Sequence, residues 1–204
     1  MFRAVCFDLG GVVFDSPFEA LAELEVERGL EPGSINRVIV AGGAWAANER
    51  GEIAFDEFLR RFEDELGAAG LAVGAAELMA RIRTKLRPRP AMLRAIERIR
   101  EAGLLTAAIT NNWREADGST TGGNLVARFD VFVESATSGL HKPDPAIYRL
   151  ALDLLGVEAT EAVFLDDVGR NLKSARALGM TTIKVDDPDE ALAELQALLG
   201  FGLA

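Results

Sequence analysis

Helical and extended patterns alternate along the second half of the chain, and this alternation constrains the fold more than any other feature of the sequence. Beyond Pro90, segments with apolar residues at helical spacing are separated by short, continuous apolar runs. Such runs are typical of strands that are buried on both faces of a sheet. Because strands that alternate with helices form parallel sheets with right-handed crossovers, we predict an α/β fold with helices on both faces of the sheet. The expected strands are residues 104–110, 130–134, 162–165 and 181–185, and the expected helices are residues 91–102, 143–155, 172–178 and 189–199.

One further strand is expected at the N-terminus, well before the alternating segments. The run Val5–Leu9 is apolar except for Asp8, and Gly10 and Gly11 follow it at once. A parallel strand places the residue at its carboxyl end in the crevice where open α/β sheets bind ligands. We therefore expect Asp8 in a functional site, with the two glycines letting bare backbone approach a ligand. An ordinary strand-ending turn would show the same pattern, so the rest of the chain has to decide between the two interpretations.

The residues between this first strand and the alternating segments show helical patterns without a convincing strand. Ser16 and Pro17 are typical of the start of a helix, and Pro88 and Pro90 mark a second boundary. We therefore predict two domains, a core of residues 1–15 and 88–204 and a helical domain of residues 16–87. The expected helices of the second domain are residues 18–28, 34–41, 55–66 and 78–86.

The composition limits the partners of the chain. Its formal net charge is −10, and it has a single cysteine, Cys6. Nucleic acids and anionic membrane surfaces require basic patches, so we expect neither as a partner, although local cations could still bind a small phosphorylated molecule. One cysteine cannot form an intramolecular disulfide, and no charged leader or run of about 18 apolar residues is present, so we expect a cytoplasmic protein. Nothing in the sequence indicates the oligomeric state.

Polar residues follow three of the expected strands, and a lysine in a Lys-Pro-Asp-Pro turn follows another. These residues are Asp8, Thr110 with Asn111, Lys142, and Asp166 with Asp167. In a parallel sheet all carboxyl ends lie at one edge, so we expect these groups to converge. Three neighbouring carboxylates repel one another, and Mg²⁺, which prefers oxygen ligands, would relieve the repulsion.

The same group of residues has the chemistry for phosphoryl transfer. Lys142, Thr110 and Asn111 can donate to phosphoryl oxygens. Asp8 can attack phosphorus as a nucleophile and form an aspartyl phosphate that water hydrolyses. Plain structural interpretations stay open, namely a surface lysine, a strand-end turn at Thr110 and a helix-capping pair at residues 166–167.

These residues carry a resemblance to a known family. Asp8-x-Gly10-Gly11-Val12, Thr110-Asn111, Lys142-Pro143 and Asp166-Asp167 resemble the four motifs of the haloacid dehalogenase superfamily, in the same order and over essentially the whole chain. Residues 50–53, 109–111 and 164–173 resemble the N-terminal phosphatase domain of mammalian soluble epoxide hydrolases. The resemblance implies a Rossmann-like core with an inserted helical cap.

The resemblance also implies roles for individual residues. It makes Asp8 the nucleophile and Thr110, Asn111 and Lys142 the phosphate binders. It places Mg²⁺ on Asp8, on the backbone carbonyl of Gly10 and on Asp167. Asp166 would be an additional ligand or lie just behind the ligands, and Asn171 would support the site through water.

Gly10 departs from the family pattern. Phosphatases of this superfamily usually carry an aspartate at this position as the general acid and base, and such help is typically worth about 10²–10⁴-fold in rate. We therefore expect a slow phosphatase, with Asp15 and His141 as candidate substitutes that each have a simpler structural interpretation. Two alternatives stay open: a catalytically weak domain that binds a phosphorylated ligand, favoured by Gly10, and a 2-haloacid dehalogenase, disfavoured because metal-free relatives lack the acidic pair.

Substrate choice should depend on the helical domain, because the core holds only the phosphoryl group. Trp45, Asn48, Glu49 and Arg50 of that domain, and Trp113 beside the Thr110 loop, are candidates to line the entrance. Packing inside the helical domain is an equally good interpretation of the two tryptophans.

Overall fold

A computed structural model describes residues 1–120 and 122–203 of the chain. Within these residues, five strands form one parallel sheet in the order β3-β2-β1-β4-β5. The strands are β1 (Ala4–Phe7), β2 (Leu105–Thr110), β3 (Val131–Glu134), β4 (Ala162–Asp166) and β5 (Thr181–Lys184). The predicted parallel α/β fold is thus confirmed, with the N-terminal strand at the centre of the sheet.

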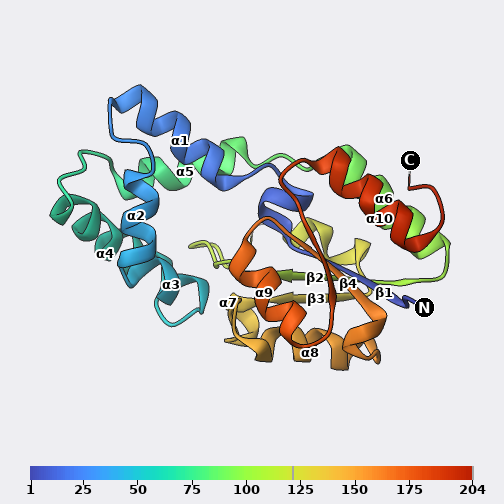
Figure 1. Cartoon of the computed structure of the whole chain (residues 1–204). Coiled ribbons are helices and arrows are strands. Elements are labelled where there is room, and N and C mark those ends of the chain that lie inside the picture. The colour runs from blue at the N-terminus through green and yellow to red at the C-terminus, as the bar shows by residue number, and fades with distance from the viewer. Residues whose placement is uncertain (121, 204) are drawn as a thin grey trace.

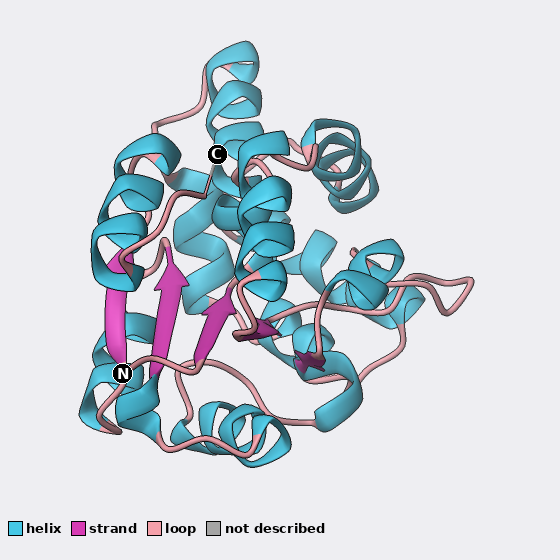
Figure 2. Ribbon diagram, turned by 90° about the vertical axis from the view of Figure 1, so that its right-hand side faces the viewer, coloured by secondary structure: helices cyan, strands magenta, loops and turns pink. Residues whose placement is uncertain are grey.

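Helices cover both faces of this sheet (Figures 1 and 2). The helices α6 (Pro90–Glu101) and α10 (Pro188–Leu199) pack on one face, and α8 (Pro145–Leu155) and α9 (Gly169–Ala177) pack on the other. Alternate residues of β1 serve the two faces, since Val5 and Phe7 contact the first layer and Ala4 and Cys6 the second. This double burial explains why the strand reads as a continuous apolar run.

Of the helices between β1 and β2, the five that precede α6 lie beside the sheet and share a second hydrophobic cluster (Figure 1). They are α1 (Pro17–Arg28), α2 (Ser34–Ala41), α3 (Ala44–Glu49), α4 (Phe55–Ala68) and α5 (Ala75–Lys85), and we call them the helical insert. The chain enters and leaves the insert through two segments that lie side by side, where Phe14 bridges Pro88. The division into domains at residues 16 and 87 stays a prediction.

The start of each of three insert helices is fastened by a glutamate from another helix. α2, α3 and α5 follow a glycine and have no capping side chain next to them. Instead, Glu25 accepts hydrogen bonds from the N–H groups of Gly33 and Ile35, at 2.6 and 2.8 Å. Glu65 caps α3 and Glu63 caps α5 in the same way. Helix α3 was not predicted from the sequence, because its cap lies far away along the chain.

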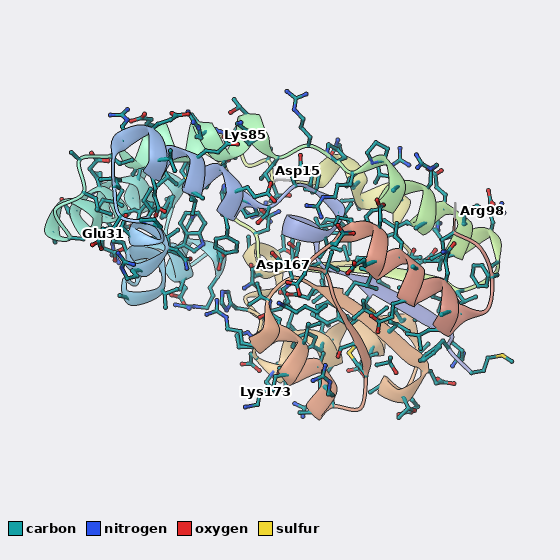
Figure 3. The ribbon with its side chains drawn as sticks, turned by 45° about the horizontal axis from the view of Figure 1, so that its top comes forward. Asp15, Glu31, Lys85, Arg98, Asp167 and Lys173 are labelled. Carbon is teal, nitrogen blue, oxygen red and sulfur yellow. The ribbon has the colours of Figure 1, made fainter. Side chains whose placement is uncertain are left out.

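Short helical turns connect the larger elements. They are η1 (Leu9–Val13), η2 (Gly123–Arg128), α7 (Ser135–Ser138) and η3 (Ala159–Glu161). Figure 3 shows Asp15 on the crossing to the insert and Asp167 at the edge of the core nearest to it, whereas Lys173 lies on an outer surface. No helix within residues 1–120 and 122–203 has the length and apolar character that a membrane crossing needs.

Candidate active site

The sheet register brings three of the predicted site segments together. Phe7 pairs with Ala108 of β2 and with Leu165 of β4, so Asp8 follows one residue beyond both pairs. Thr110 and Asp166, the last residues of those two strands, therefore lie beside it. Chain order reverses between β1 and β4, and such a switch point is where open α/β sheets bind ligands.

Lys142 lies at the centre of the site and is not a surface lysine, because only 1% of it is exposed. Its Nζ is 2.7 Å from Asp8 Oδ2 and 2.7 Å from Asp166 Oδ2, and it lies over the ring of Phe164. Burial by itself would lower the pKa of Lys142, but the charges of Asp166 and Asp8 hold it above its usual value. The ammonium group is therefore held between two carboxylates in a buried setting.

The carboxylates of Asp8, Asp166 and Asp167 converge, with one oxygen of each lying within 4.8 Å of the others. Burial raises the pKa of Asp8 to about 8, against the opposing charge of Lys142, and the other two carboxylates add to the rise. Burial, followed by the charge of Asp166, raises the pKa of Asp167 to about 6. One lysine therefore does not balance the negative charge of the cluster, and a further cation would stabilise it.

The cluster fits a divalent cation with oxygen ligands. Gly11 has a φ of 76°, and a Cβ on it would lie only 2.2 Å from Asp167 Oδ2, so the absence of a side chain there leaves room for this carboxylate. Asp166 already accepts hydrogen bonds from Lys142, Asn171 and the N–H of Val168. Asn171 Oδ1 is buried and has no hydrogen-bond partner among the described residues. An all-oxygen set with a free buried carbonyl suits Mg²⁺ and its water ligands.

Thr110 and Asn111 differ in which group each presents to the site. The Thr110 hydroxyl lies in the pocket wall and makes only a long contact of 3.4 Å to the Asn111 carbonyl. The Asn111 carboxamide binds the main chain of Lys142, accepting from its N–H at 2.8 Å and donating to its carbonyl at 3.0 Å. Asn111 therefore orients the lysine with its side chain, which leaves its own backbone N–H as the group that could meet a phosphate.

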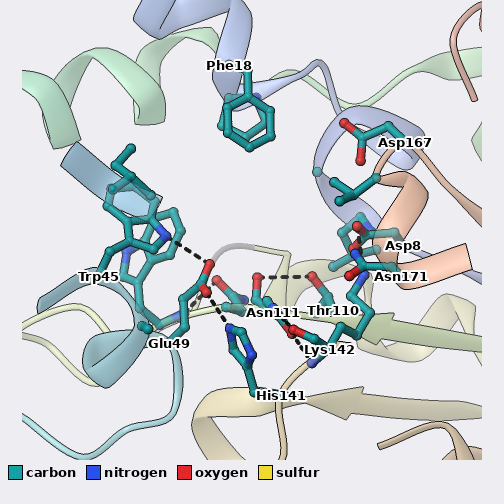
Figure 4. A pocket seen from close by; sticks show the side chains of 18 of the residues that line it. Asp8, Phe18, Trp45, Glu49, Thr110, Asn111, His141, Lys142, Asp167 and Asn171 are labelled. Atoms are coloured by element: carbon teal, nitrogen blue, oxygen red, sulfur yellow. Dashed lines mark hydrogen bonds and ion pairs between the residues drawn. The ribbon is translucent and has the colours of Figure 1, made fainter. Parts of the chain in front are cut away.

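A pocket of about 390 Å³ lies between this cluster and the helical insert (Figure 4). Its far wall is mostly apolar and includes Phe14, Phe18, Leu21, Ile39, Trp45 and Trp113. Phe18 keeps 44% of its surface exposed although it is a large aromatic residue. Phe18 was predicted to lie on a helix but not in a ligand site, because helical spacing alone does not distinguish a core face from a pocket wall.

The structure brings together most of the remaining predicted residues, but not all. Trp45 and Trp113 line the pocket and also pack with the hydrophobic cluster of the insert, and their part in substrate choice stays a prediction. Arg50 is paired with Glu52 and is absent from the pocket wall within the described residues. Asp15 is likewise outside the wall, paired with Arg89.

His141 lies in the pocket wall, but its ring is engaged. Its Nε2 is 2.8 Å from Glu49 Oε2 of helix α3. Gly10 also lies in the wall, with an ordinary φ of −66°. A Cβ on Gly10 would meet only the ring of Pro17, at 3.5 and 3.7 Å. The backbone therefore does not require glycine at this position, and a Cβ would fit there.

Known proteins resemble this chain in sequence over nearly its whole length. A family model for haloacid dehalogenase-like hydrolases matches residues 2–179. The chain is 39% identical to acyl-CoA dehydrogenase family member 10 of Mus musculus over 99% of its own length, and 34% identical to bifunctional epoxide hydrolase 2 of Sus scrofa over 98%. It spans only 20% of the first protein and 39% of the second.

Two further matches cover most of both proteins. The sesquiterpene phosphatase astK of Aspergillus oryzae is 26% identical, over 98% of this chain and 97% of that protein. The fold also matches a crystal structure of a HAD family enzyme from Bacteroides thetaiotaomicron in complex with magnesium and inorganic phosphate, with a TM-score of 0.63 and 19% identity over 90% of this chain and 94% of that one. At this identity the structural match speaks for the fold alone.

Proposed function

The chain belongs to the haloacid dehalogenase-like hydrolases, and we propose that it is a Mg²⁺-dependent phosphatase that hydrolyses small phosphate monoesters through Asp8. The observation that carries this proposal is the contact of Lys142 Nζ with Asp8 and Asp166 inside the cluster of three carboxylates. A nucleophile beside a buried cation, at the end of a central strand, is the arrangement that attack on a phosphate requires. The phosphatase among the relatives supports the same reaction class.

In the proposed reaction, Lys142 and Thr110 bind phosphoryl oxygens while Asp8 attacks. A bond forms between a carboxylate oxygen of Asp8 and phosphorus as the bond to the alcohol oxygen breaks, and the departing alkoxide takes up a proton. Water then attacks the aspartyl phosphate and gives up a proton, which releases inorganic phosphate and restores the carboxylate. Asn111 keeps Lys142 in place through its main chain during both steps.

Asp8, Asp167 and the Gly10 carbonyl are the residues that would hold Mg²⁺, with Asp166 directly behind them. The ion supplies positive charge to the phosphoryl oxygens and to the carboxylate cluster. Asp166 has its oxygens occupied by Lys142, Asn171 and Val168, so we assign it to orienting the lysine more than to binding the metal. Asn171 Oδ1 is available to accept a hydrogen bond from a water of the ion.

We propose that the helical insert serves as the cap and that the substrate carries an apolar alcohol. The pocket wall opposite the carboxylates is formed by side chains such as Phe18, Ile39 and Trp45. These side chains offer apolar surface to the part of the ligand beyond the phosphate. This wall fits an isoprenoid monophosphate better than a small polar ester such as phosphoglycolate. A dehalogenase is the weaker proposal, because the carboxylate cluster calls for a cation that attack on carbon does not need.

Hydrolysis of p-nitrophenyl phosphate tests the reaction. We expect turnover that requires Mg²⁺, that EDTA abolishes and that Asp8→Asn abolishes, whereas Asp64→Asn on the exposed face of α4 retains it. No turnover above the Asp8→Asn background, together with binding of inorganic phosphate, would favour the alternative of a phospho-ligand-binding domain. Halide release from a 2-haloacid without metal would favour the dehalogenase instead.

A competition between two esters tests the apolar wall. We expect a higher kcat/KM for an isoprenoid monophosphate than for phosphoglycolate. Phe18→Ser should lower kcat/KM for the isoprenoid ester and leave the value for phosphoglycolate nearly unchanged, because only the first ligand reaches the apolar wall. Equal losses for both esters would contradict the assignment.

A further inference from the structure

Two contacts join the helical insert to the core beside the pocket, and each lies within two residues in sequence of a phosphate-binding group of the proposed function. The first contact is the pair Glu49 and His141, and His141 directly precedes Lys142. The second is Trp113, which follows Thr110 and Asn111 within the same loop. We call these the two docking contacts. Their positions raise the question of whether the insert acts on the phosphate site.

The first docking contact is a chain of hydrogen bonds that begins inside the insert. Trp45 Nε1 donates to Glu49 Oε1 at 3.0 Å, and Glu49 Oε2 lies 2.8 Å from His141 Nε2 (Figure 4). The side chains of His141 and Glu49 are only 20% and 15% exposed. Both oxygens of Glu49 are thus engaged, one toward the insert and one toward the segment that carries Lys142. A pair with so little solvent exposure holds its geometry better than a fully exposed ion pair does.

The second docking contact places a core residue inside the insert. Trp113 is buried and packs in the hydrophobic cluster of the insert, with its ring centroid 5.7 Å from that of Trp45. Its Nε1 donates to Glu115 Oε1 at 3.0 Å, and Glu115 Oε2 accepts from Arg83 of α5 at 3.1 Å. The loop that begins at Thr110 is therefore held by the insert through both a buried ring and an ion pair.

We propose that Glu49 and Trp113 are positioning residues: the insert acts through His141 on Lys142 and through Trp113 on the Thr110–Asn111 loop. The two phosphate-binding segments are themselves joined, because the Asn111 carboxamide binds the main chain of Lys142. A shift of the insert therefore moves both segments together. Linkage makes the effect reciprocal, so bound phosphate strengthens the docking contacts by the same factor as the contacts strengthen phosphate binding.

Binding of inorganic phosphate in the presence of Mg²⁺, measured by calorimetry on the full chain, tests this inference. We expect Glu49→Ala to weaken phosphate binding by about 5-fold or more, which is the lower end of typical coupling between sites. His141→Ala should weaken it to a similar degree, and the double variant no further, because the two side chains act as one pair. Trp113→Phe tests the second contact independently. The matched control is Glu57→Ala, which removes an exposed ion pair with Arg61 inside α4 and should leave phosphate binding unchanged.

A spectroscopic measurement separates positioning from a general loss of structure. Trp45 and Trp113 are the two tryptophans of the chain, so near-ultraviolet circular dichroism reports on their contact. In Glu49→Ala we expect a weakened signal that phosphate and Mg²⁺ partly restore. The inference is overturned if Glu49→Ala and Trp113→Phe bind phosphate as the unaltered chain does. If the unaltered chain itself binds no phosphate, the proposed phosphate site fails first, and the inference, which rests on it, fails with it.

Discussion

Two helices of the sheet-bearing core and three helices of the insert have their starts fastened in different ways. In the core, Asp144 and Asp187 directly precede α8 and α10, and each carboxylate accepts hydrogen bonds from N–H groups of its own helix. In the insert, Glu25, Glu63 and Glu65 fasten three helices to which they do not belong. A cap beside its helix can be recognised in the sequence, whereas a cap from another helix exists only in the folded chain.

The difference means that the two regions respond differently to a lost contact. A core helix that loses its cap loses one or two local hydrogen bonds and keeps its packing on the sheet. An insert helix that loses its glutamate leaves buried N–H groups without a partner and also releases the helix that supplied the glutamate. Local fastening makes the core robust, and mutual fastening makes the insert a cooperative unit.

A gain of activity is expected at the border between the two regions, where Gly10 faces Pro17. Gly10→Asp introduces a carboxyl group two residues after Asp8, and its Cβ would meet only Pro17, at ordinary contact distance. We expect kcat for p-nitrophenyl phosphate to rise by about 10²-fold, as a general acid and base would supply. Gly10→Asn is the control, because it has the same size and no acid. Equal kcat values for the two variants would show that an added acid at position 10 does not restore proton transfer.

Lys142→Met tests the most strongly coupled charges of the core. The change leaves Asp8 and Asp166 side by side without their cation, which should cost about 3–5 kcal/mol of unfolding free energy and abolish turnover. Urea denaturation in Mg²⁺-free buffer measures the loss. Lys173→Met, on the exposed face of α9, should be close to neutral in both assays, and a similar loss there would contradict the assignment.

The carboxylate cluster predicts an unusual pH dependence for the metal-free chain. Because the folded pKa values of Asp8 and Asp167 are raised to about 8 and about 6, their protonated forms favour folding at low pH. This contribution is fully present below about pH 4 and is lost as the pH rises through 6 and 8, by at most about 1.4 kcal/mol per pH unit and group. We expect the Tm in EDTA to fall between pH 5 and pH 8 and Mg²⁺ to oppose the fall. A Tm that rises across this range in EDTA would contradict the prediction.

Glu25→Ala probes the mutual fastening of the insert. It leaves the N–H groups of Gly33 and Ile35 without their acceptor. We therefore expect a loss of about 2 kcal/mol in unfolding free energy. The control is Glu23→Ala on the same helix as Glu25, which removes an exposed ion pair with Lys85 of α5. It should cost less than about 1 kcal/mol of unfolding free energy. If the two variants lose the same unfolding free energy, the cross-helix cap stabilises the insert no more than an exposed ion pair does.

Asp187→Ala probes local fastening in the core and gives the smallest expected effect. Removal of the cap of α10 should cost about 1 kcal/mol, measured by urea denaturation. The control is Asp186→Ala, because Asp186 is the neighbouring aspartate and is not the capping residue of α10. A loss at Asp187 larger than that at Glu25 would reverse the contrast between the two regions.

The same contrast explains how much of the fold and the site could be predicted from the sequence. The strand ends at Asp8, Thr110 and Asp166 could be predicted, because a buried run followed by a polar residue is a local pattern. Helix α3 could not, since its capping residue Glu65 lies on a different helix. Most elements of the core could therefore be predicted from patterns of neighbouring residues.

Within the site, residue types could be predicted but not their partners. Asn111 was predicted to supply a hydrogen-bond donor to phosphate, and the structure adds that its side chain binds the main chain of Lys142, 31 positions away. The pair of His141 and Glu49 joins residues 92 positions apart. Contacts at such separations leave no periodicity or motif in a single sequence, and they become apparent only when the strands and the insert are placed in space.

The bridge between Phe14 and Pro88 has a consequence for how such a chain can evolve. Because the chain leaves and rejoins the sheet at neighbouring points, the segment between them can change in length or be exchanged at little cost in loop-closure entropy. A lineage could therefore acquire a new leaving-group preference by replacing one segment while it inherits the phosphate chemistry unchanged. The two docking contacts would limit that exchange, since a newly acquired segment has to rebuild the contacts with His141 and Trp113 before the inherited chemistry works at full rate.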